Sequence, residues 1–245
     1  MKNFAVFALG LGLASTLFAQ ASLRLNGSTT VQAALESKQT QLEQAVGRDI
    51  EFSATGTNVG LASLAAGSAD VAMLSTPLEE VAHKLNEKTP GTVDVRQYQS
   101  ASIGHVKIAF IVNPHNRVRK LSAAQVADLL TGRIKNWKDV GGADAKVLVV
   151  SLANAGSTVQ HELLKGTPIT STARLVPNAM QIPVVVAQEA DAIGIISTAH
   201  VKGPTSLVET DAEILIPLFL VTKGAPTPEQ QKLIDTARKL LEHAG

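Results

Sequence analysis

The residues best suited to chemistry in this sequence are small hydroxyl side chains in turns that separate apolar runs from helical patterns. Ser28-Thr29-Thr30 follows a short apolar run, Thr55-Gly56-Thr57 follows a second one, and a third turn of small residues spans 151–158. A helix that begins at such a turn exposes backbone N–H groups that bind anions readily. The repetition favours a shared binding site. For the first turn, a helix cap formed by Ser28 or Thr29 is an equally good interpretation.

Other chemistries lack the side chains that they need. His161 lies four residues after Ser157, but no G-x-S-x-G nucleophile turn accompanies the pair, so we expect a solvated histidine on a helix. His105, His115 and His200 are isolated, without H-x-x-x-H spacing or clustered carboxylates. The sequence therefore predicts no enzyme, no metal site and no cofactor.

Strands and helices alternate along the chain, which predicts an α/β fold with mostly parallel strands and ligands at their carboxyl ends. After the first hydroxyl turn we expect one helix that carries Val31, Leu35 and Leu42. The chain ends with an amphipathic helix over 228–241. Asp70 and Asp191 flank buried strands, and structural hydrogen bonds explain both at least as well as ligand contact.

The segment 105–142 carries the clearest structural signals. Val106–Val112 is an apolar, β-branched run that predicts a buried strand. Ser122 is placed to cap a helix, and Thr131-Gly132 is placed to end it. Trp137, the only tryptophan, is expected to anchor a loop rather than to stack on a ligand.

Composition and the first residues indicate an exported protein. The 245 residues carry a net charge of +1 with scattered Lys and Arg, which argues against a nucleic-acid partner. Lys2, the apolar run Phe4–Phe18 and the small residues Ala19-Gln20-Ala21 predict a signal peptide over 1–21. The run is shorter than the roughly 20 apolar residues of a membrane span. The absence of Cys excludes a lipid-anchored cysteine and disulfides. We therefore expect a periplasmic protein.

The sequence IVNPHNRVRKLSAAQVADLLTGRIKNWKDVGG, with further landmarks in order along the chain, resembles periplasmic phosphate-binding proteins of the PstS-like type. The landmarks are 27–31, 67–71, 192–194 and 217–224. The resemblance implies a two-lobed type II periplasmic binding protein fold with two crossover strands. Lobe 1 is expected over 22–103 and 206–245, and lobe 2 over 104–205.

The resemblance also implies a function. The chain is expected to be a monomer that captures phosphate or a related oxyanion in the interlobe cleft and delivers it to an inner-membrane ABC permease. Carried over by position, Thr29 and Thr158 match ligand-binding threonines, and Thr57 stands where the family has Ser. The implied ligand residues are Ser28, Thr29, Thr30, Thr57, Ser75, Gly156, Ser157 and Thr158.

Two departures from the family pattern bear on affinity. Ser75-Thr76 replaces an acidic residue or a Ser-Arg pair, and Leu152 replaces an arginine. A lost charge-assisted bond costs about 1.5–3 kcal/mol. Lys107 or Arg174 could replace the guanidinium. The alternative function is a scaffold of the same fold with a weak or altered site, acting as an interaction or sensory partner.

Overall fold

The computed structural model describes residues 21–153 and 157–242. Within them, nine strands form one sheet in the order β2-β1-β3-β9-β4-β7-β5-β6, and β8 pairs with β4. The strands are β1 (Leu23–Gly27), β2 (Ile50–Ser53), β3 (Val71–Leu74), β4 (Tyr98–Val112), β5 (Leu148–Leu152), β6 (Arg174–Val176), β7 (Ala192–Ser197), β8 (Ser206–Leu207) and β9 (Leu215–Lys223). The α-helices are α1 (Thr29–Glu36), α2 (Gln39–Val46), α3 (Thr57–Ala65), α4 (Leu78–Lys88), α5 (Ala123–Thr131), α6 (Ser157–Glu162), α7 (Gln181–Gln188) and α8 (Pro228–Glu242). The short 3₁₀ turns are η1 (Val95–Gln97), η2 (Trp137–Val140) and η3 (Thr198–His200).

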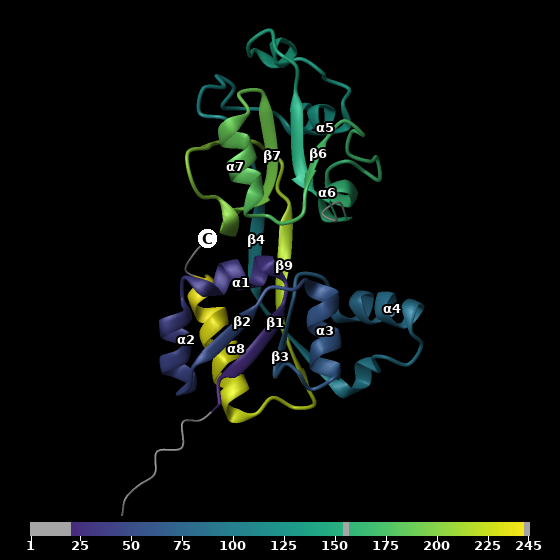
Figure 1. Ribbon diagram of the computed structural model, residues 1–245, viewed down its shortest axis with the longest axis vertical. Helices are drawn as coiled ribbons and strands as arrows, with labels where there is room; N and C mark the ends of the chain where they lie inside the picture. The colour runs from purple at the N-terminus through teal and green to yellow at the C-terminus, as the bar shows by residue number, and fades with distance from the viewer. Residues whose placement is uncertain (1–20, 154–156, 243–245) are drawn as a thin grey trace, which may run out of the picture.

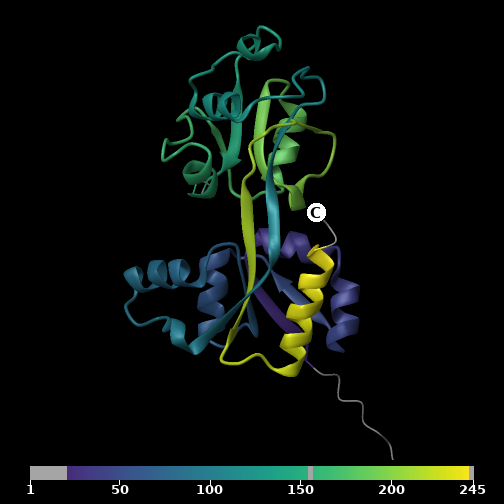
Figure 2. The same ribbon diagram turned by 180° about the vertical axis from the view of Figure 1, so that it is seen from behind.

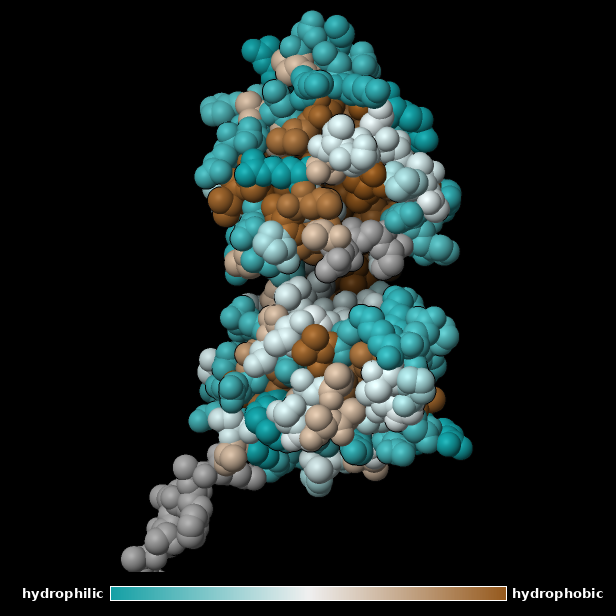
Figure 3. Space-filling view, turned by 45° about the vertical axis from the view of Figure 1, so that its right-hand side comes forward, coloured by the Kyte–Doolittle hydropathy of each residue, from teal (hydrophilic) through white to brown (hydrophobic). Residues whose placement is uncertain are grey.

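The sheet is shared between two lobes. β1 runs parallel to β2 and β3 in the first lobe, and β5 runs parallel to β6 and β7 in the second. β4 and β9 lie antiparallel, side by side, and cross from one lobe to the other (Figures 1 and 2). The space-filling view shows the two lobes separated by a narrow waist (Figure 3). The predicted two-lobed α/β fold with two crossover strands is confirmed. The expectation of mostly parallel pairing is wrong, because the two crossover strands pair antiparallel with each other and with their neighbours β3, β7 and β8.

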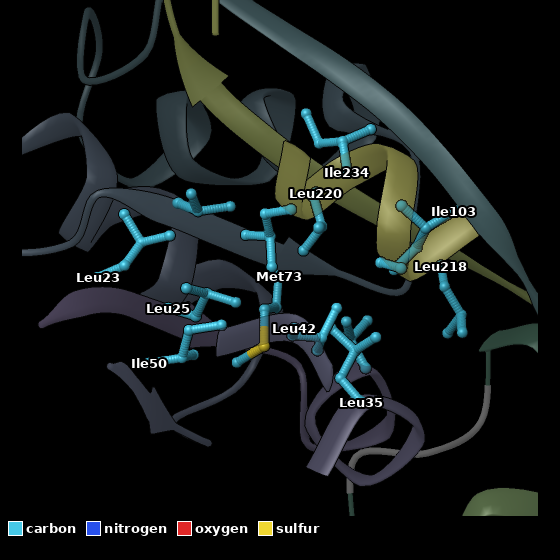
Figure 4. Close-up of a cluster of buried hydrophobic side chains, with 14 of the residues drawn as sticks. Leu23, Leu25, Leu35, Leu42, Ile50, Met73, Ile103, Leu218, Leu220 and Ile234 are labelled. Carbon is cyan, nitrogen blue, oxygen red and sulfur yellow. The ribbon is translucent and has the colours of Figure 1, made fainter. Parts of the chain in front are cut away.

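Each lobe has its own hydrophobic core. In the first lobe, Leu233 and Ile234 of α8 pack with Leu25 and Met73 of the sheet. Figure 4 labels Leu25, Met73 and Ile234 in this cluster. The amphipathic closing helix of the prediction therefore covers the first lobe. The second lobe has a separate cluster that includes Trp137.

Local capping signals were predicted correctly. Ser122 caps α5 with its side chain, and Gln125 completes a reciprocal capping box at the same helix start. Gly132 ends α5 in the left-handed conformation, with φ +76. The helix is fixed by residues at its own two ends, so its bounds follow from the sequence.

The helix after the first hydroxyl turn differs from its prediction. Instead of one helix through Val31, Leu35 and Leu42, the chain forms α1 and α2, separated by Ser37-Lys38. Lys38 leaves helical geometry with φ −114 and ψ 5, and both leucines stay fully buried in the first-lobe core. Because a spacing of seven residues suits one straight helix, the pattern gave no sign of the break.

Trp137 anchors the loop after α5, as predicted. Its side chain is 1% exposed, and its Nε1 donates a hydrogen bond to the carbonyl oxygen of Asp191 at 2.8 Å. This bond ties the loop to the turn that precedes β7.

We expect Trp137→Phe to lower the free energy of unfolding by about 1–3 kcal/mol, because it removes that hydrogen bond and part of a buried ring. Urea unfolding followed by circular dichroism measures the change. Lys138→Ala, at the exposed neighbouring position, is the control. An unfolding midpoint that is the same in both variants would contradict the anchoring role.

Candidate anion site

The first hydroxyl turn lies at the carboxyl end of β1. Ser28 is 3% exposed, and its Oγ accepts hydrogen bonds from the backbone N–H groups of Thr30 (3.2 Å) and Val31 (3.4 Å). Its own N–H donates to the carbonyl of Met73 at 2.8 Å. Ser28 thus caps α1, as one interpretation of the sequence held, while Thr29 and Thr30 are half-buried at the helix start.

The second turn meets the end of β3. Thr57 is the first residue of α3, and its Oγ1 lies 3.2 Å from the Oγ of Ser75. Gly56 is the N-cap of α3, with φ +99, and it supplies no side-chain acceptor to the first N–H groups of the helix. N–H groups at a helix start that lack a side-chain cap are suited to hydrogen-bond an anion.

Close glycine contacts hold these turns together. A Cβ atom on Gly60 would lie 2.4 Å from the Cα of Gly27, so α3 packs directly on the end of β1. The N–H of Gly56 donates to the carbonyl of Gly27 at 2.8 Å, and the hydroxyl of Thr55 donates to the Oδ1 of Asn26. The three turns that follow β1, β2 and β3 therefore lie at one edge of the sheet. Gly60 was not identified from the sequence, because its close neighbour, Gly27, lies on β1, far away in the sequence.

The contribution of the second lobe stays a prediction. Gly156 and the side chain of Ser157 lie outside the described residues. Thr158 is half-buried in the first turn of α6, and Figure 1 shows α6 on the side of the second lobe that faces the first. Leu152, the last residue of β5, is partly buried against an apolar cluster of that lobe.

The basic residues considered as substitutes for the missing guanidinium are paired with carboxylates. The Nη1 of Arg174 lies 3.0 Å from the Oε1 of Glu189, and the Nζ of Lys107 lies 4.0 Å from the Oε1 of Glu213. All four side chains are exposed by 45% or more. These contacts give no support to either residue as a ligand of the anion.

The aspartates flanking strands have structural roles. Asp70 accepts hydrogen bonds from the backbone N–H of Arg24 and from its guanidinium, each at 2.9 Å. The guanidinium holds the pKa of Asp70 below its ordinary value. Asp191 accepts the Trp137 hydrogen bond through its carbonyl oxygen. The Asp70 contacts agree with structural hydrogen bonding, whereas the Asp191 contact uses the backbone and leaves the role of that side chain a prediction.

One histidine that sequence reasoning treated as isolated lies where the lobes touch. His200 belongs to η3, which follows β7 and packs against α1 of the first lobe. The imidazole is 3% exposed, and its Nδ1 lies 2.8 Å from the Oγ of Ser197. Burial lowers the pKa of His200, while the backbone of Thr29 acts to raise it. The helix on which η3 packs is remote in sequence, so no local pattern could have identified this position.

His161 is a solvated helical histidine, as predicted. Its side chain is 85% exposed, and its Nδ1 lies 3.1 Å from the Oε1 of the neighbouring Glu162. In the described part of the chain, no group of three His, Cys, Asp or Glu side chains is placed to hold a metal ion. None of the described helices is long and apolar enough to cross a membrane.

Two open hollows of the surface lie away from the hydroxyl turns. One of about 570 Å³ lies between β4 and α8 and is lined by Ser102 and Arg238, among others. The other, of about 360 Å³, is lined by residues that include Arg24, Arg48 and Asp70. Neither includes a residue of the predicted anion site.

Comparison with known sequences gives consistent matches. A family model described as the PBP superfamily domain matches residues 14–234. The chain is 27% identical to the phosphate-binding protein PstS of Bacillus subtilis over 141 residues, which are 57% of this chain and 44% of that protein. It is 34% identical to the phosphate-binding protein PstS 2 of Streptococcus agalactiae over 92 residues, which are 38% of this chain and 28% of that protein. The chain thus matches less than half the length of these relatives.

Solved structures share the fold over nearly the whole chain. A candidate phosphate ABC transporter substrate-binding protein from Clostridium perfringens, solved with bound phosphate, matches with a TM-score of 0.73 at 26% identity. That match covers 88% of this chain and 92% of the other. An ABC-type phosphate transport receptor from Vibrio cholerae matches with a TM-score of 0.62 at 22% identity, over 92% of this chain and 98% of the other.

Proposed function

This chain belongs to the PBP superfamily as a PstS-like type II periplasmic binding protein, and on that premise we propose that it captures phosphate or a related oxyanion between its lobes for an ABC transporter. The observation that carries the proposal is the meeting of three hydroxyl turns at the carboxyl ends of β1, β2 and β3, marked by the 3.2 Å contact between Thr57 and Ser75. Ligands of open α/β sheets bind at such edges. The structurally similar Clostridium perfringens protein was solved with bound phosphate.

We assign the binding to neutral donors. The start of α3, which no side chain caps, provides free backbone N–H groups. The positive ends of the α1 and α3 helix dipoles both attract an anion. The hydroxyls of Thr29, Thr30, Thr57 and Ser75 are the proposed ligands from the first lobe. Ser28 caps α1 by accepting two hydrogen bonds, and its hydroxyl proton is left to donate to the anion. The second lobe is proposed to contribute 156–158.

The lobes are proposed to close on the ligand by bending at the crossover strands. We keep the lobe boundaries proposed from the sequence, except that residues 206–214 are moved from the first lobe to the second. Val208 and Ile214 pack into the core of the second lobe, so the return to the first lobe is assigned to β9. Phosphate at saturation should then reduce the radius of gyration measured by solution scattering.

The cellular setting follows from the same proposal. Residues 1–21 are proposed to be a signal peptide that directs the chain to the periplasm, where it works as a monomer with an inner-membrane ABC permease. The relatives are named as phosphate-binding proteins, and we propose a binding role without catalysis.

Calorimetric titration of the purified protein with phosphate, sulfate, molybdate and phosphonate tests this function. Phosphate is expected to bind at micromolar concentration. In a Thr29→Ala, Thr158→Ala double variant the affinity should fall about thirtyfold, because each lost neutral hydrogen bond costs about 1 kcal/mol.

Exposed threonines provide the control for that titration. Thr89→Ala with Thr167→Ala removes one exposed threonine from each lobe, and the affinity should not change. Binding of none of the four anions would overturn the proposed function and leave the alternative, a scaffold that acts through a partner protein. Preference for sulfate or molybdate over phosphate would assign a different oxyanion to the same site.

A further inference from the structure

We propose that His200 is a positioning residue of the anion site: it joins the second lobe to the start of α1 and adds a titratable positive charge beside it. The inference rests on the proposed function and deepens it, because it makes anion affinity depend on pH. The argument begins with the contact between the lobes.

η3 belongs to the second lobe but packs on the first. It follows β7, whose strand is paired along its length with β4 and β5. Ala199, in the middle of η3, packs against the first-lobe core that contains Val31 and Leu35 of α1. η3 therefore connects the two lobes directly, in addition to the crossover strands.

The same contact lies at the proposed binding edge. β5 and β7 are parallel, so the chain leaves both strands at one edge of the second lobe. η3 packs against α1 of the first lobe, and the backbone of Thr29, the first residue of α1, acts to raise the pKa of His200. His200 therefore lies in the segment that packs on the helix whose hydroxyls and positive end are proposed to bind the anion.

The ring is held in one orientation. Its Nδ1 lies 2.8 Å from the hydroxyl of Ser197, which leaves Nε2 as the nitrogen for the first lobe. The ring is 3% exposed, so a charge placed on it is weakly screened by water. A proton gained by His200 would therefore place a weakly screened positive charge where η3 packs on α1.

The surroundings of the ring determine its protonation state in the free protein. Burial and the positive charge of Lys202 lower the pKa of His200, whereas Glu36, at the end of α1, acts to raise it. β4 also packs against η3, and its nearby titratable side chains, His105 and Lys107, are both exposed. The imidazole is thus neutral at pH 7 in the free protein, because its pKa lies below the ordinary 6.5.

A bound anion reverses this balance. Its negative charge favours the imidazolium, so the pKa of His200 is higher in the complex than in the free protein. By reciprocity, protonation of His200 strengthens anion binding by the same factor. The contribution of His200 to affinity should be constant at alkaline pH, rise as the pH falls through the pKa of the complex, and level off below the pKa of the free protein.

Phosphate titrations of the wild type and His200→Gln from about pH 8 to about pH 5 test the proposal. Glutamine keeps a donor near the Nε2 position but does not titrate. Because phosphate ionises identically in both experiments, the ratio of the two affinities reports on His200 alone. The ratio should be constant at high pH and increase about tenfold across the range, the change given by one unit of pKa difference. His83→Gln is the control, since His83 is 75% exposed on α4.

NMR titration of the histidine ring resonances in the wild-type protein, with and without phosphate, measures the same coupling and needs no variant to fold. Phosphate should raise the midpoint of the His200 resonance. An affinity ratio that is independent of pH, or a midpoint that phosphate does not move, overturns the role of His200 and leaves the proposed function intact. A wild type that binds no phosphate at any pH overturns the proposed function itself.

Discussion

Gly27→Ala is expected to destabilise the protein by about 4 kcal/mol or more, the largest effect of any single substitution predicted for this chain. Gly27 ends β1 with φ +141, where a side chain is strained. An added Cβ would also lie 2.1 Å from the carbonyl oxygen of Met73. That oxygen accepts the N–H of Ser28, and β3 is fixed on its other side by pairing with β9, Met73 opposite Leu220. The clash therefore cannot be relieved by a small shift of one strand.

Gly47→Ala is the control that separates backbone strain from the steric clash of an added Cβ atom. Gly47 also has a positive φ, +82, but a Cβ added there would meet no atom within 4 Å. It should cost only about 1–2 kcal/mol, the strain of a left-handed residue. Urea unfolding of both variants, followed by circular dichroism, measures the difference. Equal losses in the two variants would show that close packing at the anion edge is not what requires glycine at position 27.

Structural features that depend on a few neighbouring residues were predicted correctly from the sequence. Ser122 and Gly132 mark the two ends of α5 because a cap and a left-handed glycine act on the backbone next to them. The break between α1 and α2 could not be predicted, since Leu35 and Leu42 keep a spacing that fits one continuous helix as well as two. Both leucines are fully buried in the first-lobe core, whichever local structure the pattern suggests.

Contacts between distant segments limited what could be predicted about the site. The turns after β1 and β2 were identified from their hydroxyl residues and Ser75 from the resemblance, but the contact of Thr57 with Ser75 depends on the strand order β2-β1-β3. The packing of η3 on α1 depends on the position of one lobe against the other. Neither has a signature in the residues beside it, so His200 was left among the isolated histidines.

Leu152→Arg is expected to increase phosphate affinity by about ten- to 150-fold. Leu152 is the last residue of β5 and directly precedes the turn 153–158. Its position corresponds to an arginine in the PstS-like pattern. A guanidinium there could form a charge-assisted, bidentate contact with phosphate, worth about 1.5–3 kcal/mol, and each 1.4 kcal/mol is about tenfold in affinity. Calorimetric titration at about 0.15 M salt measures the gain while screening long-range attraction.

Leu175→Arg makes the same exchange on the adjacent strand and is the matched control. Leu175 lies opposite Ser151 in the pairing of β5 with β6, and its side chain is 57% exposed. An affinity change of less than about twofold is expected there, because an exposed charge away from the ligand is screened. Equal gains in the two variants would mean that added positive charge attracts phosphate without a specific contact. If neither variant binds phosphate more tightly, the anion lies away from the end of β5. The neutral donors of the first lobe would then hold it with ligands other than 156–158. A gain of phosphate affinity in Leu152→Arg alone would show that this chain keeps the geometry of a charged phosphate site. The wild type would then bind through its neutral groups because the arginine side chain is absent.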